Sequence, residues 1–78
     1  MKNTDTKKTV FAVCISNEDY PASLEVGKLY PIIADKQAES HGYLRVVDES
    51  GEDYAYARDR FFLINIPEAL EKVLLKAA

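Results

Sequence analysis

The stretch LRVVDESGEDYAYA, residues 44–57, decides the fold of this chain. Two segments of alternating apolar side chains flank six residues, of which four are acids. A three-residue turn that ends in the glycine predicts a β-hairpin in which Val46 pairs with Tyr54 and Leu44 with Tyr56. All four side chains then face one core, whereas a four-residue turn would split the apolar set between two faces. The pattern therefore predicts both the hairpin and its register.

The acids of this turn admit three interpretations. A cation site would need the ligand number and spacing of a calcium loop, which DESGED lacks. A solvated turn that discourages edge-to-edge association is the simplest interpretation. The third is an acidic docking point for a basic partner. On the outer face, Arg45 lies diagonal to Asp53 and is expected to offset part of its charge.

The remaining elements follow from apolar alternation and from the glycines and prolines that bound it. A helical turn ending at Gly42 is expected within 35–42, and a helix over 66–78 carries its apolar residues on one face. Strands are predicted at residues 9–15, 28–34, 43–48, 53–57 and 61–64. In domain terms the chain divides into a flexible N-terminus (1–7), a β-barrel (8–65) and a C-terminal helix packed on it (66–78).

The predicted core takes the inward side chains of each strand and the apolar face of the helix. Tyr20, Tyr30 and Tyr43 are left over and are expected to be partly exposed. The core is expected to contain Val13, Ile15, Leu24, Val26, Leu29, Leu44, Val46, Tyr54, Tyr56, Phe61, Ile64, Leu70, Val73 and Leu74.

The order of these elements resembles an SH3-like barrel. AVCI (12–15) matches the first strand of that family, LEVGKLY (24–30) the approach to its second strand, and GEDYAYARDRF (51–61) its distal hairpin, last long strand and short 3₁₀ turn. The resemblance covers about residues 9–65. It implies a mostly β fold, a single five-stranded antiparallel SH3-like barrel, with the C-terminal α-helix added.

The chain departs from the peptide-binding SH3 domains at their ligand groove. It has no tryptophan, and the family's proline and tyrosine near the 3₁₀ turn are replaced by Ala57 and Arg60. Proline-rich ligands need a flat aromatic groove, so that function is not carried over. The longer string from Ser16 to Ile64 resembles a group of small bacterial SH3-like proteins, a likeness that implies no activity.

Composition narrows the classes of function. The 78 residues have a net charge of −3, with lysines and arginines scattered among more numerous acids. Nucleic-acid binders usually carry a basic face, so a nucleic-acid partner is disfavoured. No apolar run approaches the length of a membrane span, and no secretory signal pattern is seen. We expect a cytoplasmic protein without membrane association, either a monomer or a weak dimer.

Catalytic chemistry has few candidate groups. Cys14 is the one thiol and His41 the one imidazole. A nucleophilic pair would need them within hydrogen-bond reach, but Cys14 lies within an apolar strand, where cysteine usually acts as a small buried hydrophobe. His41 lies in a polar loop and is expected to be solvated. No catalytic residue, cofactor or metal site is predicted.

The sequence therefore predicts a small non-catalytic binding module, not an enzyme. Its partner would be a protein or peptide, basic in character, that contacts the long first loop, the acidic hairpin and the 3₁₀ turn. Two alternatives stay open: a small barrel that binds nucleic acid, and a redox or enzymatic activity of Cys14. The predicted binding residues are Glu18, Asp19, Tyr20, Glu49, Glu52, Arg58 and Arg60.

Overall fold

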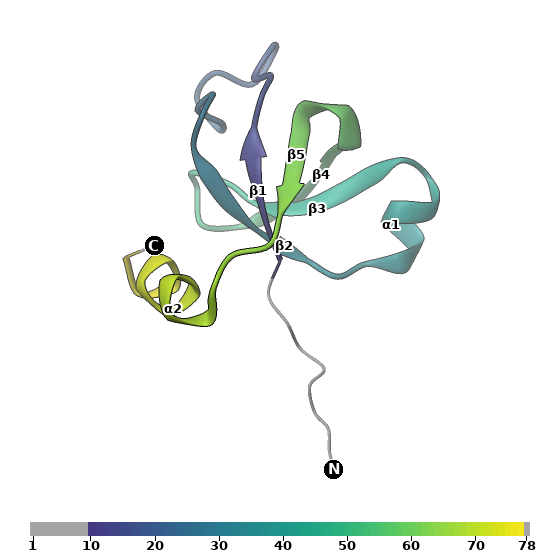
Figure 1. The fold of residues 1–78 in the computed structure, drawn as a ribbon. Helices are drawn as coiled ribbons and strands as arrows, with labels where there is room; N and C mark the ends of the chain where they lie inside the picture. Colours follow the sequence, from purple (N-terminus) through teal and green to yellow (C-terminus); the bar gives the residue numbers. More distant parts are fainter. Residues whose placement is uncertain (1–9, 78) are drawn as a thin grey trace.

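The computed structural model describes residues 10–77, so the predicted flexible segment 1–7 lies outside the described residues. Five strands, two short helices and a C-terminal helix follow one another along the chain (Figure 1). In order they are β1 (Val10–Cys14), β2 (Leu29–Ile33), α1 (Lys36–Ser40), β3 (Tyr43–Val47), β4 (Asp53–Ala57), the 3₁₀ helix η2 (Arg58–Arg60), β5 (Phe61–Ile64) and α2 (Glu68–Ala77).

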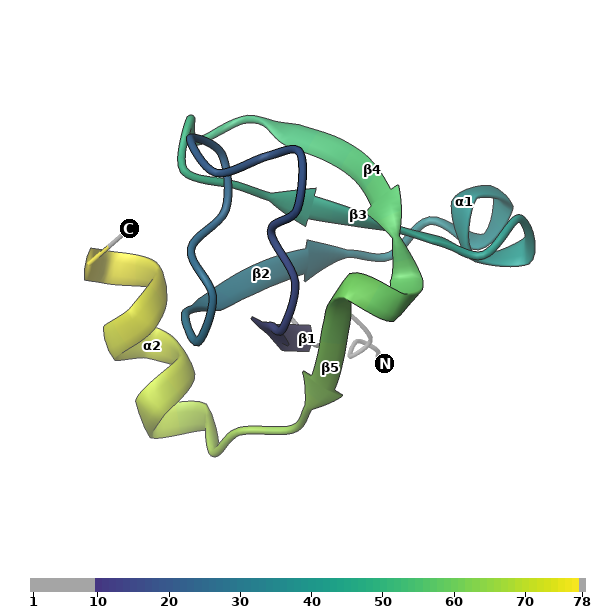
Figure 2. The same cartoon turned by 90° about the horizontal axis from the view of Figure 1, so that it is seen from above.

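The strands form one antiparallel sheet in the order β4-β3-β2-β1-β5. The fold is therefore mostly β with a C-terminal helix, as predicted. Within residues 10–77 the sheet is not closed, because β4 and β5 are its two edges and no ladder joins them. The sheet curls strongly, and η2 carries the chain from β4 to β5 on its open side (Figure 2).

The predicted hairpin register is confirmed. Leu44 pairs with Tyr56 and Val46 with Tyr54, and the Gly51 nitrogen donates to the Asp48 carbonyl at 2.9 Å to close the turn. Gly51 has a φ of +85°, the left-handed conformation that a three-residue hairpin loop needs at this position. The turn chemistry and the apolar alternation thus act together to fix how β3 meets β4.

The inward face of β1 is the opposite of the predicted one. Ala12 and Cys14 are fully buried in the main core, whereas Ile15 is 54% exposed and Val13 only half-buried. Phe11, which points to the opposite face from Ala12 and Cys14, is also buried, so both faces of β1 are largely covered. Its residues are therefore apolar on both sides, and alternation could not tell inside from outside.

Other core predictions are divided. Val26 is exposed in a turn, and Tyr54 is 50% exposed because β4 is an edge strand with neighbours on one side only. Tyr30, predicted to be partly exposed, is buried, while Tyr20 and Tyr43 are exposed as expected. Among the other predicted core residues, Leu24, Leu44, Val46, Tyr56 and Phe61 are buried, and Leu29, Ile64 and Leu74 are half-buried.

The helical turn before Gly42 is also confirmed. Asp35 caps α1 by accepting a hydrogen bond from the Ala38 nitrogen at 3.0 Å. Arg45 of β3 joins this cap to the hairpin, with Nε 2.8 Å from the Asp35 carboxylate and Nη1 3.0 Å from that of Asp53. The predicted offset of Asp53 by Arg45 is thus observed, and the same guanidinium also holds α1 against β3.

The C-terminal helix α2 approaches the outer face of the sheet, on the side away from α1 (Figures 1 and 2). Its Leu74 shares a hollow with Phe11, Leu29 and Pro31. Phe11, buried although it points away from the main core, is a core residue that the sequence prediction missed. Two further core predictions were wrong, because Leu70 and Val73 are exposed. The helix meets the sheet along the edge of its apolar stripe.

The need for glycine at residue 51 can be tested by placing L-alanine or D-alanine there. Nothing lies within 4 Å of a Cβ placed there, so backbone strain is the expected cost of Gly51→Ala. That cost is about 1–2 kcal/mol for an L-residue in the left-handed region, measured by urea unfolding. A synthetic chain with D-alanine at residue 51 is the control. It should be at least as stable as the parent, because a D-residue favours positive φ and restricts the unfolded chain. Equal losses in both chains would contradict this account.

Candidate functional site

The first loop, residues 15–28 between β1 and β2, is held by its own hydrogen bonds. The Tyr20 nitrogen donates to the Asn17 carbonyl at 2.8 Å, and the Leu24 nitrogen donates to the Tyr20 carbonyl at 3.0 Å. Asn17 Nδ2 also donates to the Leu24 carbonyl at 3.1 Å, and Leu24 is buried. Asp19 has a φ of +75°. The loop is therefore a defined platform for the side chains at its tip.

Tyr20 is fixed at this tip by two neighbours from distant parts of the chain. Its ring packs edge-on against Tyr56 with centroids 5.1 Å apart, and the Arg60 guanidinium lies 4.8 Å from its centroid. Arg60 Nη1 also donates to the Glu18 carbonyl at 2.6 Å. Such stacking is a favourable cation–π arrangement. Arg60 thus clamps η2 to the loop and leaves Tyr20 43% exposed.

Asp48 lies beneath this cluster and is the one charged residue of the described chain that is buried, at 5% exposure. Its carboxylate accepts from the Tyr56 hydroxyl at 2.6 Å, the Ser50 hydroxyl at 2.6 Å and the Ser50 nitrogen at 2.9 Å. Burial alone would raise the pKa of Asp48, but the bonds from Ser50 and Tyr56 outweigh it and hold the pKa below its usual value. Burial, reinforced by Asp48, raises the pKa of Tyr56 to about 12.

Glu49 joins the hairpin turn to β2 and to the first loop. Its Oε2 lies 2.7 Å from Lys28 Nζ and accepts from the Tyr30 hydroxyl at 2.6 Å. Its backbone nitrogen donates to the Ser23 carbonyl at 3.0 Å. The Lys28 ammonium, together with the Tyr30 hydroxyl, holds the pKa of Glu49 below its usual value. The predicted binding residue Glu49 is therefore already engaged by groups of its own chain.

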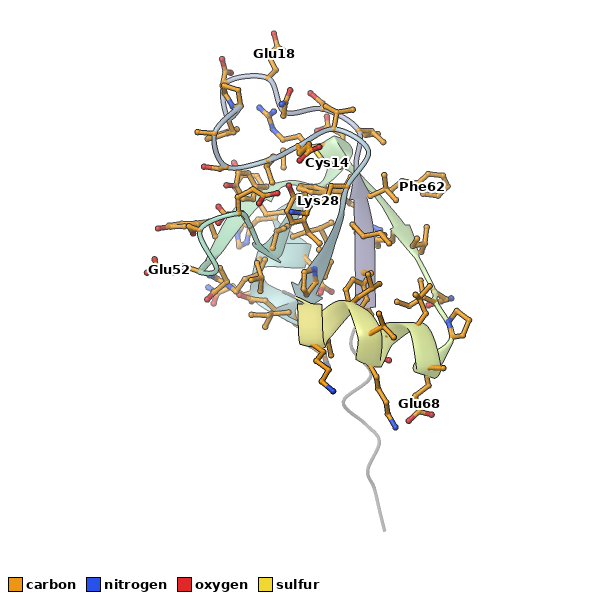
Figure 3. The ribbon with its side chains drawn as sticks, turned by 90° about the vertical axis from the view of Figure 1, so that its left-hand side faces the viewer. Cys14, Glu18, Lys28, Glu52, Phe62 and Glu68 are labelled. Carbon is orange, nitrogen blue, oxygen red and sulfur yellow. The ribbon has the colours of Figure 1, made fainter. Side chains whose placement is uncertain are left out.

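Most of the predicted binding residues come together at this end of the molecule. The first-loop residues Glu18, Asp19 and Tyr20 are exposed next to Arg60, which is half-buried. Figure 3 shows Glu18 at the outer end of the loop, whereas Glu52 projects from the hairpin on another side of the molecule, well apart from Glu18. Glu52 is exposed and accepts from the Tyr54 hydroxyl at 3.1 Å.

Arg58 is placed apart from the others. Its backbone nitrogen donates to the Gly42 carbonyl at 2.9 Å, next to the start of β3, whereas Arg60 at the other end of η2 reaches Glu18. Three residues that organise the site were missed from the sequence: Asp48, Tyr56 as its partner, and Lys28. An aspartate two residues before a serine in a turn is a known pattern for side-chain capping, and it could have revealed Asp48.

The redox or enzymatic alternative for Cys14 would need a base near the thiol, and His41 does not lie there. The Cys14 thiol is fully buried and contacts the Ser16 carbonyl at 3.6 Å, while His41 is exposed and its Nδ1 lies 2.8 Å from the Gln37 carbonyl. Burial raises the pKa of the thiol more than the Ser16 contact and the Arg60 charge lower it. No cluster of metal-binding side chains occurs among residues 10–77.

Comparisons of the chain with protein-family models, with curated proteins and with solved structures gave no significant match. In the part of the chain that the structure describes, no helix is long and apolar enough to cross a membrane. The functional interpretation therefore rests on the geometry of the site.

The Asp48 network should make stability depend on pH in a specific direction. Because the folded pKa of Asp48 is depressed, its ionisation stabilises the fold above the unfolded value of about 3.9. This stabilisation is lost as the pH falls through the folded pKa. Asp48→Asn should cost about 1–3 kcal/mol at neutral pH and flatten the decline of the unfolding free energy between about pH 4 and pH 2.

The matched control is Asp59→Asn, which neutralises an exposed acid on η2. It should change the unfolding free energy by less than about 0.5 kcal/mol. Tyr56→Phe, which removes one donor to Asp48, should also destabilise. If the unfolding free energy fell equally with decreasing pH in Asp48→Asn and in the parent, this would contradict the role assigned to Asp48.

The buried thiol of Cys14 should react only when the chain opens. Alkylation with iodoacetamide is expected to be slower than that of a free thiol by at least about a thousandfold, the scale set by global unfolding. The rate should rise in parallel with destabilisation by urea. Fast labelling of the native protein would instead indicate an accessible thiolate and would support the redox alternative.

Proposed function

We propose that the protein is a small non-catalytic binding module that recognises a basic, extended segment of another protein. The contact area is the loop-end surface, defined as the exposed side chains of Glu18, Asp19 and Tyr20. The observation that carries this proposal is the Tyr20 ring, which is held in place by Tyr56 and Arg60 yet remains 43% exposed beside these acids.

Charge balance at this end supports a basic partner. Within residues 10–77, Glu18 and Asp19 form no ion pair, and Lys28 is already paired with Glu49. Arg60 is held by the backbone carbonyl of Glu18 and by the ring of Tyr20, so the two loop acids outnumber the one unpaired cation beside them. An aromatic ring beside carboxylates suits a lysine or arginine side chain, because the cation meets both the ring and the acids. Such charges favour encounter and specificity more than affinity.

Some of the cations among residues 10–77 are already paired within the chain, which weakens the case for nucleic-acid binding. Arg45 is paired with Asp35 and Asp53, and Lys28 with Glu49. A phosphate backbone needs several free cations on one face. The strand order, the long first loop and η2 before β5 support an SH3-like barrel, and in this proposal the loop-end surface replaces the missing proline-binding groove.

The proposal is tested by titrating the protein with a nona-arginine peptide and following backbone NMR shifts. Shifts should concentrate at Glu18, Asp19 and Tyr20, and binding should weaken as salt rises. Glu18→Lys should raise the Kd about threefold or more, which corresponds to a surface charge interaction of somewhat under 1 kcal/mol. Tyr20→Ala should weaken binding further.

Glu68→Lys is the matched control, because it changes the net charge equally on α2, far from Glu18 (Figure 3). It should leave the Kd within a factor of about 1.5, because charges beyond a Debye length are largely screened at physiological salt. Equal weakening by Glu18→Lys and Glu68→Lys would indicate unspecific attraction to an acidic protein and would refute the proposed surface. Tighter binding of a single-stranded oligonucleotide than of the peptide would favour the nucleic-acid alternative.

A further inference from the structure

The outer edge of β5 presents backbone groups that have no partner strand among the described residues. Backbone groups of successive residues in a strand point to opposite sides. The Cys14 nitrogen donates to Lys28 on the β2 side, and the Ile15 nitrogen donates to Arg60 on the β5 side. With Val13 opposite Phe62 and Phe11 opposite Ile64, Phe62 and Ile64 direct their N–H and C=O groups toward β1. Those of Leu63 therefore point outward.

The two edges of the sheet differ in how they resist pairing with another chain. β4 begins at Asp53, directly after the acids of the hairpin turn. Charges of this kind protect an edge strand from association. The sequence of β5 is FFLI, with no charge, proline or glycine. By these criteria β5 is the unprotected edge.

Two further features surround the β5 edge. Phe62 is 64% exposed, the largest exposure of a bulky apolar side chain in the described chain, and it projects away from the sheet (Figure 3). Hollows of about 600 Å³ and about 200 Å³ both include Arg58 and Leu63 in their linings. An added strand would therefore find unpaired backbone, an apolar side chain and open space at one place.

We propose that β5 pairs with β5 of a second copy of this chain, antiparallel and two-fold symmetric about Leu63. The Leu63 residues of the two copies then exchange two N–H···O=C bonds. Phe62 of one copy comes opposite Ile64 of the other as a close, non-hydrogen-bonded pair. At the ends, the carbonyl of Phe61 accepts from the Asn65 nitrogen of the other copy. The Phe61 N–H is not needed, because it already donates to the Arg58 carbonyl.

A second copy suits this edge for reasons of charge and symmetry. The four residues Phe61–Ile64 are uncharged, so the two paired strands place no like charges opposite each other. Pairing of β5 with β4 of another molecule would be head-to-tail, leave further edges open and place the strand against Asp53 and the hairpin acids. The paired segment is short and buries well under about 1,000 Å², which implies a weak, reversible dimer.

The test is residue-resolved hydrogen exchange of the intact chain from roughly 10 µM to roughly 1 mM, a range that spans weak association. Protection of the Leu63 amide should rise with concentration by tenfold or more. The Phe62 amide is the internal control, because it donates to β1 in either state and should be protected throughout. Sedimentation velocity over the same range should show a monomer–dimer shift.

Two variants locate the contact. Phe62→Lys places an ammonium against Ile64 of the other copy and should abolish both the sedimentation shift and the gain in Leu63 protection. Because Phe62 is exposed, the thermal midpoint of the Phe62→Lys variant at low concentration should stay within a few degrees of that of the parent protein. Tyr54→Lys makes a comparable change at a half-exposed aromatic side chain of the other edge strand and should leave association intact.

Three results would overturn the proposal. The first is a protein that stays monomeric with a fast Leu63 amide at every concentration. The second is Leu63 protection that does not depend on concentration, which would mean that the edge is covered within the chain. The third is a dimer that Tyr54→Lys abolishes and Phe62→Lys does not. None of these measurements involves the basic peptide, so this inference stands or falls separately from the proposed function.

Discussion

The carboxylate of Asp48 is the constraint on which the candidate site depends. A buried charge is costly unless hydrogen bonds replace its lost water, and here Ser50 and Tyr56 supply them. One group thereby orders the turn, through Ser50, and fixes the ring of Tyr56 on β4. Tyr56 in turn supports Tyr20. The exposed aromatic of the first loop therefore owes its position to a carboxylate that faces away from solvent.

The sequence predicts the parts of the fold where local chemistry and side-chain alternation agree. The β3–β4 hairpin is such a case, because the glycine of its turn and the apolar pattern select the same register. The helical turn before Gly42 is another. In both, the signal lies within about a dozen neighbouring residues. Prediction was possible there without knowledge of what packs against these elements.

The errors arise where burial depends on distant neighbours. The face of β1 could not be chosen because both faces are apolar, and the cover on each side comes from elements far along the chain. Tyr30 is buried because its hydroxyl finds Glu49 and the Glu25 nitrogen, partners that no local pattern shows. For the site, the loop acids and Tyr20 were proposed from their expected exposure, whereas Asp48 was missed, because its bond to Ser50 follows a local turn pattern but its burial depends on Tyr56 being held in the core.

At Asp19, a negative charge of the first loop is carried by a residue whose backbone conformation favours glycine. Its φ of +75° lies where an aspartate is tolerated but a glycine is unstrained. Replacement by glycine would relax the loop tip and at the same time remove one of its negative charges. At this position, no residue gives both an unstrained backbone and a negative charge. Selection for a more heat-resistant variant would thus tend to erode the electrostatic character of the tip, whereas asparagine would keep the conformation and lose the charge.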